Sequence, residues 1–245
     1  MLAGKTVLVT GAANRIGAQI ARTLHQNGAN LIIHYRNSSS SAHALEIELN
    51  SQRTNSTICL QADLSSCSAI ETLAQNSIEA FGQLDILVNN ASSFYPTPLG
   101  SIREDDWNNL LGSNLKGPLF LSQACFPALQ ATSGCIVNLL DIYATSPLKN
   151  HSLYSCAKAA NQMLVKSLAL EMAPQVRVNG IAPGAILWPD TGHADETRQQ
   201  AMLKTIPLQK TGNPDNIAQA VLFLINNDYI TGEVITIDGG RQLIH

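Results

Sequence analysis

The chain has 245 residues, of which 45% are hydrophobic and 13% charged, and its formal net charge is −3. This composition can bury a sizeable core, which excludes a disordered chain. The sequence also has no dense run of Lys or Arg. Because nucleic-acid binding needs clustered cations, this argues against a nucleic-acid-binding surface. No apolar stretch approaches bilayer-spanning length and the first residues lack a secretory pattern, so we expect no membrane segment and a cytoplasmic location.

Five cysteines are scattered along the chain without a Cys-x-x-Cys pair. A metal site would need clustered Cys, His or carboxylate ligands, so we expect no bound metal. We also expect the five cysteines to be free thiols in a reducing compartment. Among them, Cys156 is expected to be a small packed side chain.

Short apolar runs alternate with longer amphipathic segments along nearly the whole chain. We expect strands at residues 6–10, 31–35, 57–61, 84–89, 135–140, 176–182 and 234–238. The intervening segments predict helices, among them 15–28, 41–52, 69–81 and 159–173, because apolar residues recur there at helical spacing. This alternation indicates an α/β fold: a single domain, residues 1–245, with a doubly wound parallel sheet and helices on both faces.

A glycine-containing turn, residues 11–17, follows the first strand. Ligands of a doubly wound sheet bind beyond the carboxyl ends of its strands. Gly11 permits a tight turn, Gly17 lets the next helix pack closely, and the N–H groups at the helix start can bind the pyrophosphate of a dinucleotide. A purely structural turn has the same glycines, but the position directly after an N-terminal strand favours cofactor binding.

Arg36 and several serines follow the second strand, where an NAD site usually has an Asp or Glu for the ribose 2′-hydroxyl. A guanidinium and hydroxyls, here Arg36 and Ser38, suit a 2′-phosphate instead. We therefore expect NADPH as the cofactor. The alternative is that Arg36 is an ordinary exposed arginine.

Polar groups also follow the third and fourth strands. Asp63, together with Leu64, can accept hydrogen bonds from the adenine amino group. Asn89, Asn90 and Ala91 can line the cofactor ribose with backbone groups. Each segment is equally compatible with an ordinary polar loop, so both assignments depend on the wider pattern.

Tyr154 and Lys158 are four residues apart, which places them on one face of a helix. A free tyrosine has a pKa of about 10, too high for efficient proton transfer near neutrality, and a nearby ammonium lowers it. Reduction of a carbonyl or imine needs a proton from the protein, and this pair suits that task. The spacing is common by chance, but its place after the fifth strand of a nucleotide-binding sheet favours catalysis.

These motifs together resemble the short-chain dehydrogenase/reductase family over essentially the whole chain. The likeness rests on residues 10–17, the Asp63-Leu64 pair, residues 89–92, Asn114, the Tyr154/Lys158 pair and Pro183-Gly184.

The family resemblance implies a Rossmann-type sheet whose cofactor also contacts Ile16, Tyr35, Pro183 and Gly184. Lys158 would hold the nicotinamide ribose, and Asn114 would support a water-linked proton relay to it. On its own, Asn114 also fits an ordinary polar group of a helix or loop. Family members are usually tetramers that pair the helix of the catalytic lysine and the last strand, so we expect a homotetramer.

Two departures from the family pattern resemble its pteridine reductase branch. Arg15 stands where the glycine loop normally has its middle glycine. Asp141, thirteen residues before Tyr154, replaces the usual catalytic serine. A carboxylate cannot donate a hydrogen bond unless it is protonated, so simple ketone reduction would be poorly served.

Two further segments are similar to that branch: residues 34–38 (HYR-x-S) and 90–98 (NASSFYPTP). The resemblance implies that Phe94 stacks on a pterin against the nicotinamide, and that Ser92 and Arg15 contact the pterin or the cofactor phosphates. Stacking suits a flat heteroaromatic ligand. Alternatively, Phe94 is a buried core aromatic, although the flanking serines and prolines favour a ligand-lining loop.

The leading hypothesis is therefore NADPH-dependent reduction of pterins. The main reaction would convert dihydropterin to tetrahydropterin, with oxidised pterin or dihydrofolate as further substrates. Asp141, Tyr154, Lys158 and Asn114 would be the catalytic residues. Two alternatives are a generic short-chain reductase of ketones or 3-oxoacyl thioesters, and a non-catalytic NADP(H)-binding sensor.

Residues 184–205 contain Gly and Pro in a pattern that suits a mobile loop, so we expect a substrate lid there. Trp188 in this segment either covers the pterin or packs against a neighbour.

Overall fold

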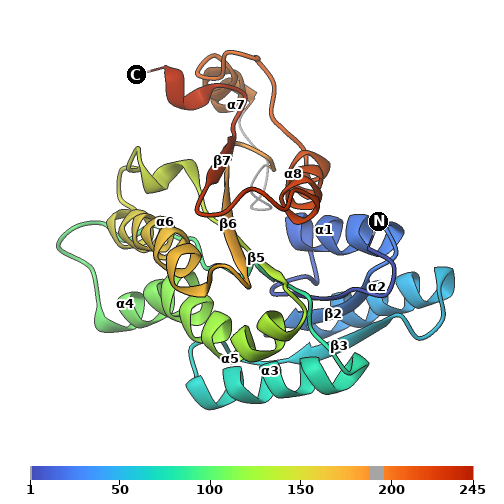
Figure 1. Cartoon of the computed structure of the whole chain (residues 1–245). Coiled ribbons are helices and arrows are strands. Elements are labelled where there is room, and N and C mark those ends of the chain that lie inside the picture. The colour runs from blue at the N-terminus through green and yellow to red at the C-terminus, as the bar shows by residue number, and fades with distance from the viewer. Residues whose placement is uncertain (1, 188–195, 245) are drawn as a thin grey trace.

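The computed structural model describes residues 2–187 and 196–244. Within these residues, a seven-stranded sheet has the order β3-β2-β1-β4-β5-β6-β7, and every neighbouring pair is parallel (Figure 1). The strands are β1 Thr6–Val9, β2 Asn30–Tyr35, β3 Thr57–Gln61, β4 Ile86–Asn89, β5 Cys135–Leu139, β6 Arg177–Pro183 and β7 Val234–Ile237. The predicted Rossmann-type α/β fold is confirmed, and every predicted strand end lies within two residues of the observed one.

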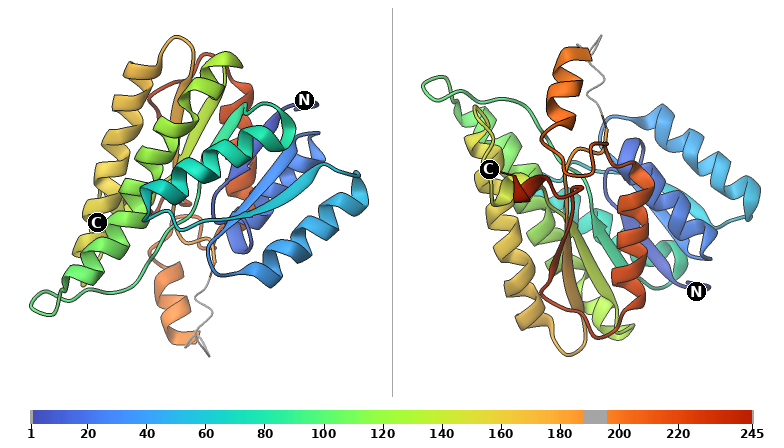
Figure 2. Two further views of the ribbon diagram at one scale, coloured as in Figure 1. Left: turned by 90° about the horizontal axis from the view of Figure 1, so that it is seen from below. Right: turned by 90° about the horizontal axis from the view of Figure 1, so that it is seen from above.

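Helices cover both faces of the sheet, as the two views of Figure 2 show in turn. One face is covered by α1 Arg15–Gln26, α2 Ser39–Gln52 and α8 Pro214–Asn226. The other is covered by α3 Cys67–Phe81, α5 Gly117–Ala131 and α6 Ser152–Met172. Elsewhere lie α4 Glu104–Leu111, the π-helical turn Gly112–Lys116 that follows it, and α7 Glu196–Leu203.

The apolar strands are buried on both sides, which explains why they read as continuous hydrophobic runs. In β1, Val7 and Val9 pack in the cluster formed with α1, α2 and α8, whereas Leu8 packs in the cluster formed with α3, α5 and α6. Successive strand side chains point to opposite faces, so a sheet covered twice needs an apolar residue at nearly every position.

Three of the four predicted helices begin earlier than predicted, whereas α1 ends at Gln26, two residues before its predicted end. Helix α6 begins at Ser152, seven residues before the predicted segment 159–173, so Tyr154 and Lys158 lie on it. The sequence predictions name no element within 104–131 or 214–226, which form α4, the π-helical turn, α5 and α8. Gly112, Gly117 and Pro127 interrupt the helical pattern there, although the backbone stays helical. None of the helices in the described part of the chain is long and apolar enough to cross a bilayer.

All five cysteines are free, and one of the sequence expectations about them is wrong. Cys156 is exposed rather than packed. The reason is helical geometry: Tyr154, Ala157 and Lys158 of α6 face the protein interior, and Cys156 falls on the opposite side of the same turn. Among the described residues, no three His, Cys, Asp or Glu side chains gather into a group that could hold a metal.

Candidate active site

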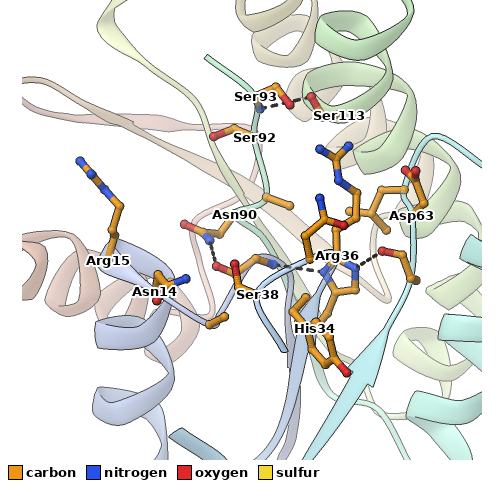
Figure 3. A pocket seen from close by; sticks show the side chains of 18 of the residues that line it. Asn14, Arg15, His34, Arg36, Ser38, Asp63, Asn90, Ser92, Ser93 and Ser113 are labelled. Carbon is orange, nitrogen blue, oxygen red and sulfur yellow. Dashed lines mark hydrogen bonds between the residues drawn. The ribbon is translucent and has the colours of Figure 1, made fainter. Parts of the chain in front are cut away.

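A cavity of about 400 Å³ opens at the carboxyl ends of β1 to β4 (Figure 3). Most of the predicted cofactor residues line it, namely Gly11, Arg15, Ile16, Gly17, Tyr35, Arg36, Ser38, Asp63, Leu64, Asn90 and Ala91. Ser92, predicted to contact the substrate, lines it as well. Tyr154, Lys158, Pro183 and Gly184 are not among its lining residues, so the predicted cofactor set is divided between this cavity and the neighbouring catalytic cluster.

The glycine turn approaches the fourth strand so closely that no side chain fits. Gly11 has φ +60°, and a Cβ on it would lie 2.9 Å from the Cα of Ala91. A Cβ on Gly17 would meet the Gly11 carbonyl and lie 2.5 Å from Nδ2 of Asn90. That amide donates to the carbonyl oxygens of Thr10 (2.8 Å) and Gly11 (3.0 Å), which fastens the turn to the end of β4.

The start of α1 fits a bound phosphate. Asn14 occupies its N-cap position but forms no side-chain capping hydrogen bond. Residues 13–17 line the cavity, so the N–H groups of the first helical turn lie at its wall. These groups and the positive end of the helix dipole favour an anion, as a dinucleotide pyrophosphate requires.

Arg36 and Ser38, which follow β2, and Asp63, which follows β3, line the same cavity (Figure 3). Oδ1 of Asp63 accepts the N–H of Ser65 at 2.9 Å. This hydrogen bond, and to a smaller extent the charge of Arg36, lowers the pKa of Asp63. The carboxylate is therefore charged near neutrality and can accept hydrogen bonds from a ligand.

Asn89 does not belong to the cavity wall, which corrects the expectation that it lines a ribose. It is buried, and its Nδ2 donates to Oδ1 of Asn138 at 2.8 Å. Nδ2 of Asn138 donates to Oδ1 of Asn161 at 2.8 Å, and Nδ2 of Asn161 donates to the backbone carbonyl of Asn114 at 2.8 Å. These three hydrogen bonds form an asparagine ladder that connects the sheet to the π-helical turn that carries Asn114.

The structure brings Asp141, Tyr154 and Lys158 together. Oη of Tyr154 donates to Oδ2 of Asp141 at 2.7 Å, while Oδ1 of Asp141 accepts the N–H of Tyr143 at 2.9 Å. Nζ of Lys158 lies 5.7 Å from the Tyr154 ring centre and donates to the carbonyl of Leu139 at 2.9 Å. Tyr154 and Lys158 are buried in this cluster.

Phe94 borders the catalytic cluster and is 54% exposed, so it is not a core aromatic. Its ring meets the Tyr154 ring edge-on, with centres 4.8 Å apart and planes at 77°. It also stacks on His151, with centres 4.8 Å apart and planes at 16°. The sequence predictions did not name His151 or the cavity residues Asn109 and Ser113, because a single polar residue outside the recognised motifs has no periodic or motif signal.

Asn114 lies in the π-helical turn, beside the loop that carries Phe94. Its Nδ2 donates to the carbonyls of Ser93 (2.9 Å) and Leu110 (3.0 Å). Its Oδ1 is buried and has no hydrogen-bond partner among the described residues. Buried polar atoms are usually satisfied, so a water or ligand group is expected there. Short π-helical segments are common at functional sites.

Other predicted residues lie at the end of β6 or outside the described residues. Pro183 ends β6, and the N–H of Gly184 donates to the carbonyl of Ile237 at 2.9 Å. Trp188 lies outside the described residues, as does the middle of the expected lid 184–205. The end of that segment forms α7.

Comparisons with known proteins place this site in a family. The family model described as enoyl-(acyl carrier protein) reductase matches residues 11–242. Pteridine reductase 1 of Leishmania tarentolae is 37% identical over 96% of each chain. The 3-oxoacyl-[acyl-carrier-protein] reductase of Staphylococcus aureus is 33% identical, and an uncharacterised oxidoreductase of Methylorubrum extorquens 32% identical, each over 98% of both chains. The chain belongs to the short-chain dehydrogenase/reductase family.

Members of this family are oxidoreductases, and its relatives imply a nicotinamide cofactor. The cavity fits such a group, because the glycine turn and the start of α1 suit its phosphates, and the polar residues that follow β2 and β3 suit its adenosine.

The electrostatics of Tyr154 differ from the sequence expectation that Lys158 lowers its pKa. Burial raises the pKa of Tyr154 most, and the neighbouring Asp141 carboxylate raises it further. Burial also lowers the pKa of Lys158 to about 8, although Asp141 opposes this. The expectation is wrong for the protein alone because burial disfavours the charged phenolate and because the nearest charge to the phenol is negative.

Burial also raises the pKa of Asp141. The hydrogen bonds from Tyr143 and Tyr154 and the positive charges of Lys158 and Arg241 lower this pKa, but burial has the larger effect. The carboxyl and the phenol therefore form one buried unit that holds protons more tightly than either group does in water. Such a unit is suited to keep a proton ready for a reacting atom.

The raised pKa of Asp141 predicts how stability depends on pH. The folded chain keeps a proton on this carboxyl that the unfolded chain loses above its ordinary pKa of 3.8. The group's contribution is therefore complete below that pH and is lost as pH rises through the folded value. We expect Asp141→Asn, which does not titrate, to be more stable than the wild type at pH 7 and to lose this advantage toward pH 4.

Urea unfolding of the wild type and of Asp141→Asn at several pH values measures the difference in their free energies of unfolding. Asp105→Asn, at an exposed position of α4, controls for the loss of one charge. Equal destabilisation by Asp141→Asn at every pH would contradict the assignment.

Proposed function

We propose that this chain is an NADPH-dependent pterin reductase that converts dihydropterin to tetrahydropterin. Oxidised pterins and dihydrofolate are proposed as further substrates. The observation that carries the proposal is the 2.7 Å hydrogen bond from Tyr154 to Asp141, with the exposed ring of Phe94 beside it. The 37% identity to pteridine reductase 1 of Leishmania tarentolae supports it.

The carboxylate at position 141 favours a substrate that donates hydrogen bonds. A serine there would donate to a ketone oxygen, whereas Asp141 accepts, and the ring and amino N–H groups of a pterin are donors. Phe94 gives a flat heteroaromatic ring a plane to lie on, next to the phenol. A C=N bond that is reduced also needs a proton on nitrogen, which Tyr154 is placed to give.

When bound, NADPH would supply the hydride to the ring carbon. Tyr154 gives the proton to the ring nitrogen, and Asp141 holds the phenol in place and shares its proton. Lys158 holds the nicotinamide ribose and restores the proton of Tyr154. Asn114, with its unpartnered Oδ1, supports the water through which that proton arrives.

The cofactor would extend along the cavity. Gly11, Gly17 and Ile16 form the pyrophosphate turn, and Arg36 and Ser38 face the 2′-phosphate. The adenine would lie against Asp63 and Leu64, and its ribose against Asn90 and Ala91, within the same cavity wall. The proposal places Tyr35 beside the adenosine and Pro183 and Gly184 beside the nicotinamide. Arg15 and Ser92 would bridge the cofactor phosphates and the pterin.

Assembly and location complete the proposal. We propose a homotetramer in the cytoplasm, with α5 and α6 at one interface. Met163 and Leu170 of α6 are 61% and 83% exposed, and Phe120 of α5 is also exposed. Apolar side chains gathered on adjacent helices favour burial against another copy. The mass in solution by light scattering decides between a tetramer and a monomer.

Reduction of 3-oxoacyl thioesters is the second candidate function, because the Staphylococcus aureus relative is 33% identical over 98% of both chains. The variant Asp141→Ser distinguishes pterin reduction from reduction of 3-oxoacyl thioesters. We expect this variant to lose about 100-fold in kcat/KM for dihydropterin, a loss typical of a missing acid–base group. A thioester reductase would keep or gain activity.

Both substrates are assayed with NADPH at the cofactor absorbance, with Asp105→Ser as the control. Full pterin activity in Asp141→Ser, or no turnover of any pterin or folate by the wild type, would remove this proposal.

Arg36 tests the choice of cofactor. If its guanidinium binds the 2′-phosphate, Arg36→Asp should raise the KM for NADPH at least tenfold, because a charge-assisted bidentate contact becomes a repulsion. The KM for NADH should stay the same or fall, which serves as an internal control. A wild-type preference for NADH, or an unchanged KM for NADPH in the variant, contradicts this assignment.

A further inference from the structure

His34 lies near the end of β2, between the glycine turn and the end of β3. Its side chain is buried, with 2% exposure, yet it forms part of the cavity wall. Nδ1 accepts the N–H of Gly11 at 3.1 Å, and Nε2 lies 3.1 Å from the carbonyl oxygen of Ala62 (Figure 3). One imidazole therefore joins the first and third strand ends across the second.

Backbone hydrogen bonds reinforce the same connection. The N–H of Ala12 donates to the carbonyl of His34 at 3.0 Å, and the N–H of Ala62 donates to the carbonyl of Tyr35 at 3.1 Å. The first two N–H groups of the glycine turn thus point toward β2. Residues 13–17, at the start of α1, line the cavity.

The hydrogen bonds fix the protonation of the ring. Since the Gly11 N–H needs an acceptor and the Ala62 carbonyl needs a donor, Nδ1 is bare and Nε2 carries the proton. Burial lowers the pKa of His34 to about 4, although the hydrogen bond with Ala62 and the charge of Asp63 act to raise it. The imidazole is therefore neutral throughout the physiological range.

The ring also connects the part of the cavity that would bind the pyrophosphate to the part that would bind the adenosine 2′-phosphate. Gly11 opens the pyrophosphate turn, Arg36 and Ser38 lie two and four residues after His34, and Asp63 follows Ala62. We propose that His34 is the positioning residue of the dinucleotide site, which sets the distance between the pyrophosphate turn and the residues around the adenosine 2′-phosphate. This inference rests on the proposed function only in taking NADPH as the ligand.

Replacement of the ring by an apolar side chain should loosen this arrangement. In His34→Leu the Gly11 N–H and the Ala62 carbonyl both lose their side-chain partner, so the turn loses its side-chain link to β2 and keeps only the contacts of Asn90 and of the backbone. We expect the Kd for NADPH to rise about tenfold, measured by fluorescence titration without any pterin. KM for NADPH should rise in step, with kcat at saturating NADPH within about twofold of the wild type.

His34→Gln is the conservative variant, because its amide offers an acceptor and a donor. We expect its Kd for NADPH to stay within about threefold of the wild type, which rescues most of the loss. His25→Leu is the matched control. His25 is also buried, at 4% exposure, but it bonds Ser56 near the far end of α1. This variant should lower the unfolding midpoint while the Kd for NADPH changes less than about twofold.

Three results would overturn the inference: wild-type affinity in His34→Leu, a loss in His34→Gln as large as in His34→Leu, or an equal loss in His25→Leu. If His34→Leu does not fold, long-range ¹H–¹⁵N spectra of the wild type decide instead. They should show the neutral Nε2–H form at pH 7 and a ¹⁵N–¹⁵N coupling between the Gly11 amide and Nδ1. A charged or Nδ1–H ring overturns the inference. A wild type that binds neither NADPH nor NADH rejects the cofactor proposal itself.

Discussion

The buried hydrogen bond from Tyr154 to Asp141 constrains the rest of the site. Both groups would titrate freely in water, but here burial raises both pKa values, so the pair holds its proton tightly. A charged carboxylate at this depth needs compensation, and the Tyr143 N–H, Lys158 and Arg241 provide it. The proposed chemistry follows from this arrangement: the site accepts hydrogen bonds where a serine would donate one, and it keeps a phenol proton beside the exposed ring of Phe94.

The sheet explains how residues so far apart in sequence meet. Each proposed group lies just past the carboxyl end of a parallel strand or on the helix that follows it, so the strand order determines which groups are neighbours. The asparagine ladder from Asn89 through Asn138 and Asn161 to Asn114 links two of these strands to the π-helical turn. His34 acts similarly on the cofactor side, since it joins three strand ends.

Much of this could be predicted from the sequence, because periodicity and glycine placement are local signals. The strands, the glycine turn and the approach of Tyr154 to Lys158 all depend on residues close together in the chain. The stack of His151 on Phe94 joins positions 94 and 151, and no local pattern reports such a contact. The sign of the Tyr154 pKa shift depends on desolvation and on Asp141, so the Tyr-x-x-x-Lys spacing alone gave the wrong direction. Cys156 was misplaced because its exposure depends on which face of α6 meets the sheet.

The central claim is that the carboxylate–phenol pair serves the reduction of a C=N bond in a flat heteroaromatic ring. The most direct measurement compares the wild-type kcat/KM for dihydropterin and for a 3-oxoacyl thioester, both with saturating NADPH. We predict a ratio of at least about 100 in favour of dihydropterin, since the thioester lacks N–H donors for Asp141 and an aromatic face for Phe94. A ratio near or below one would contradict the account.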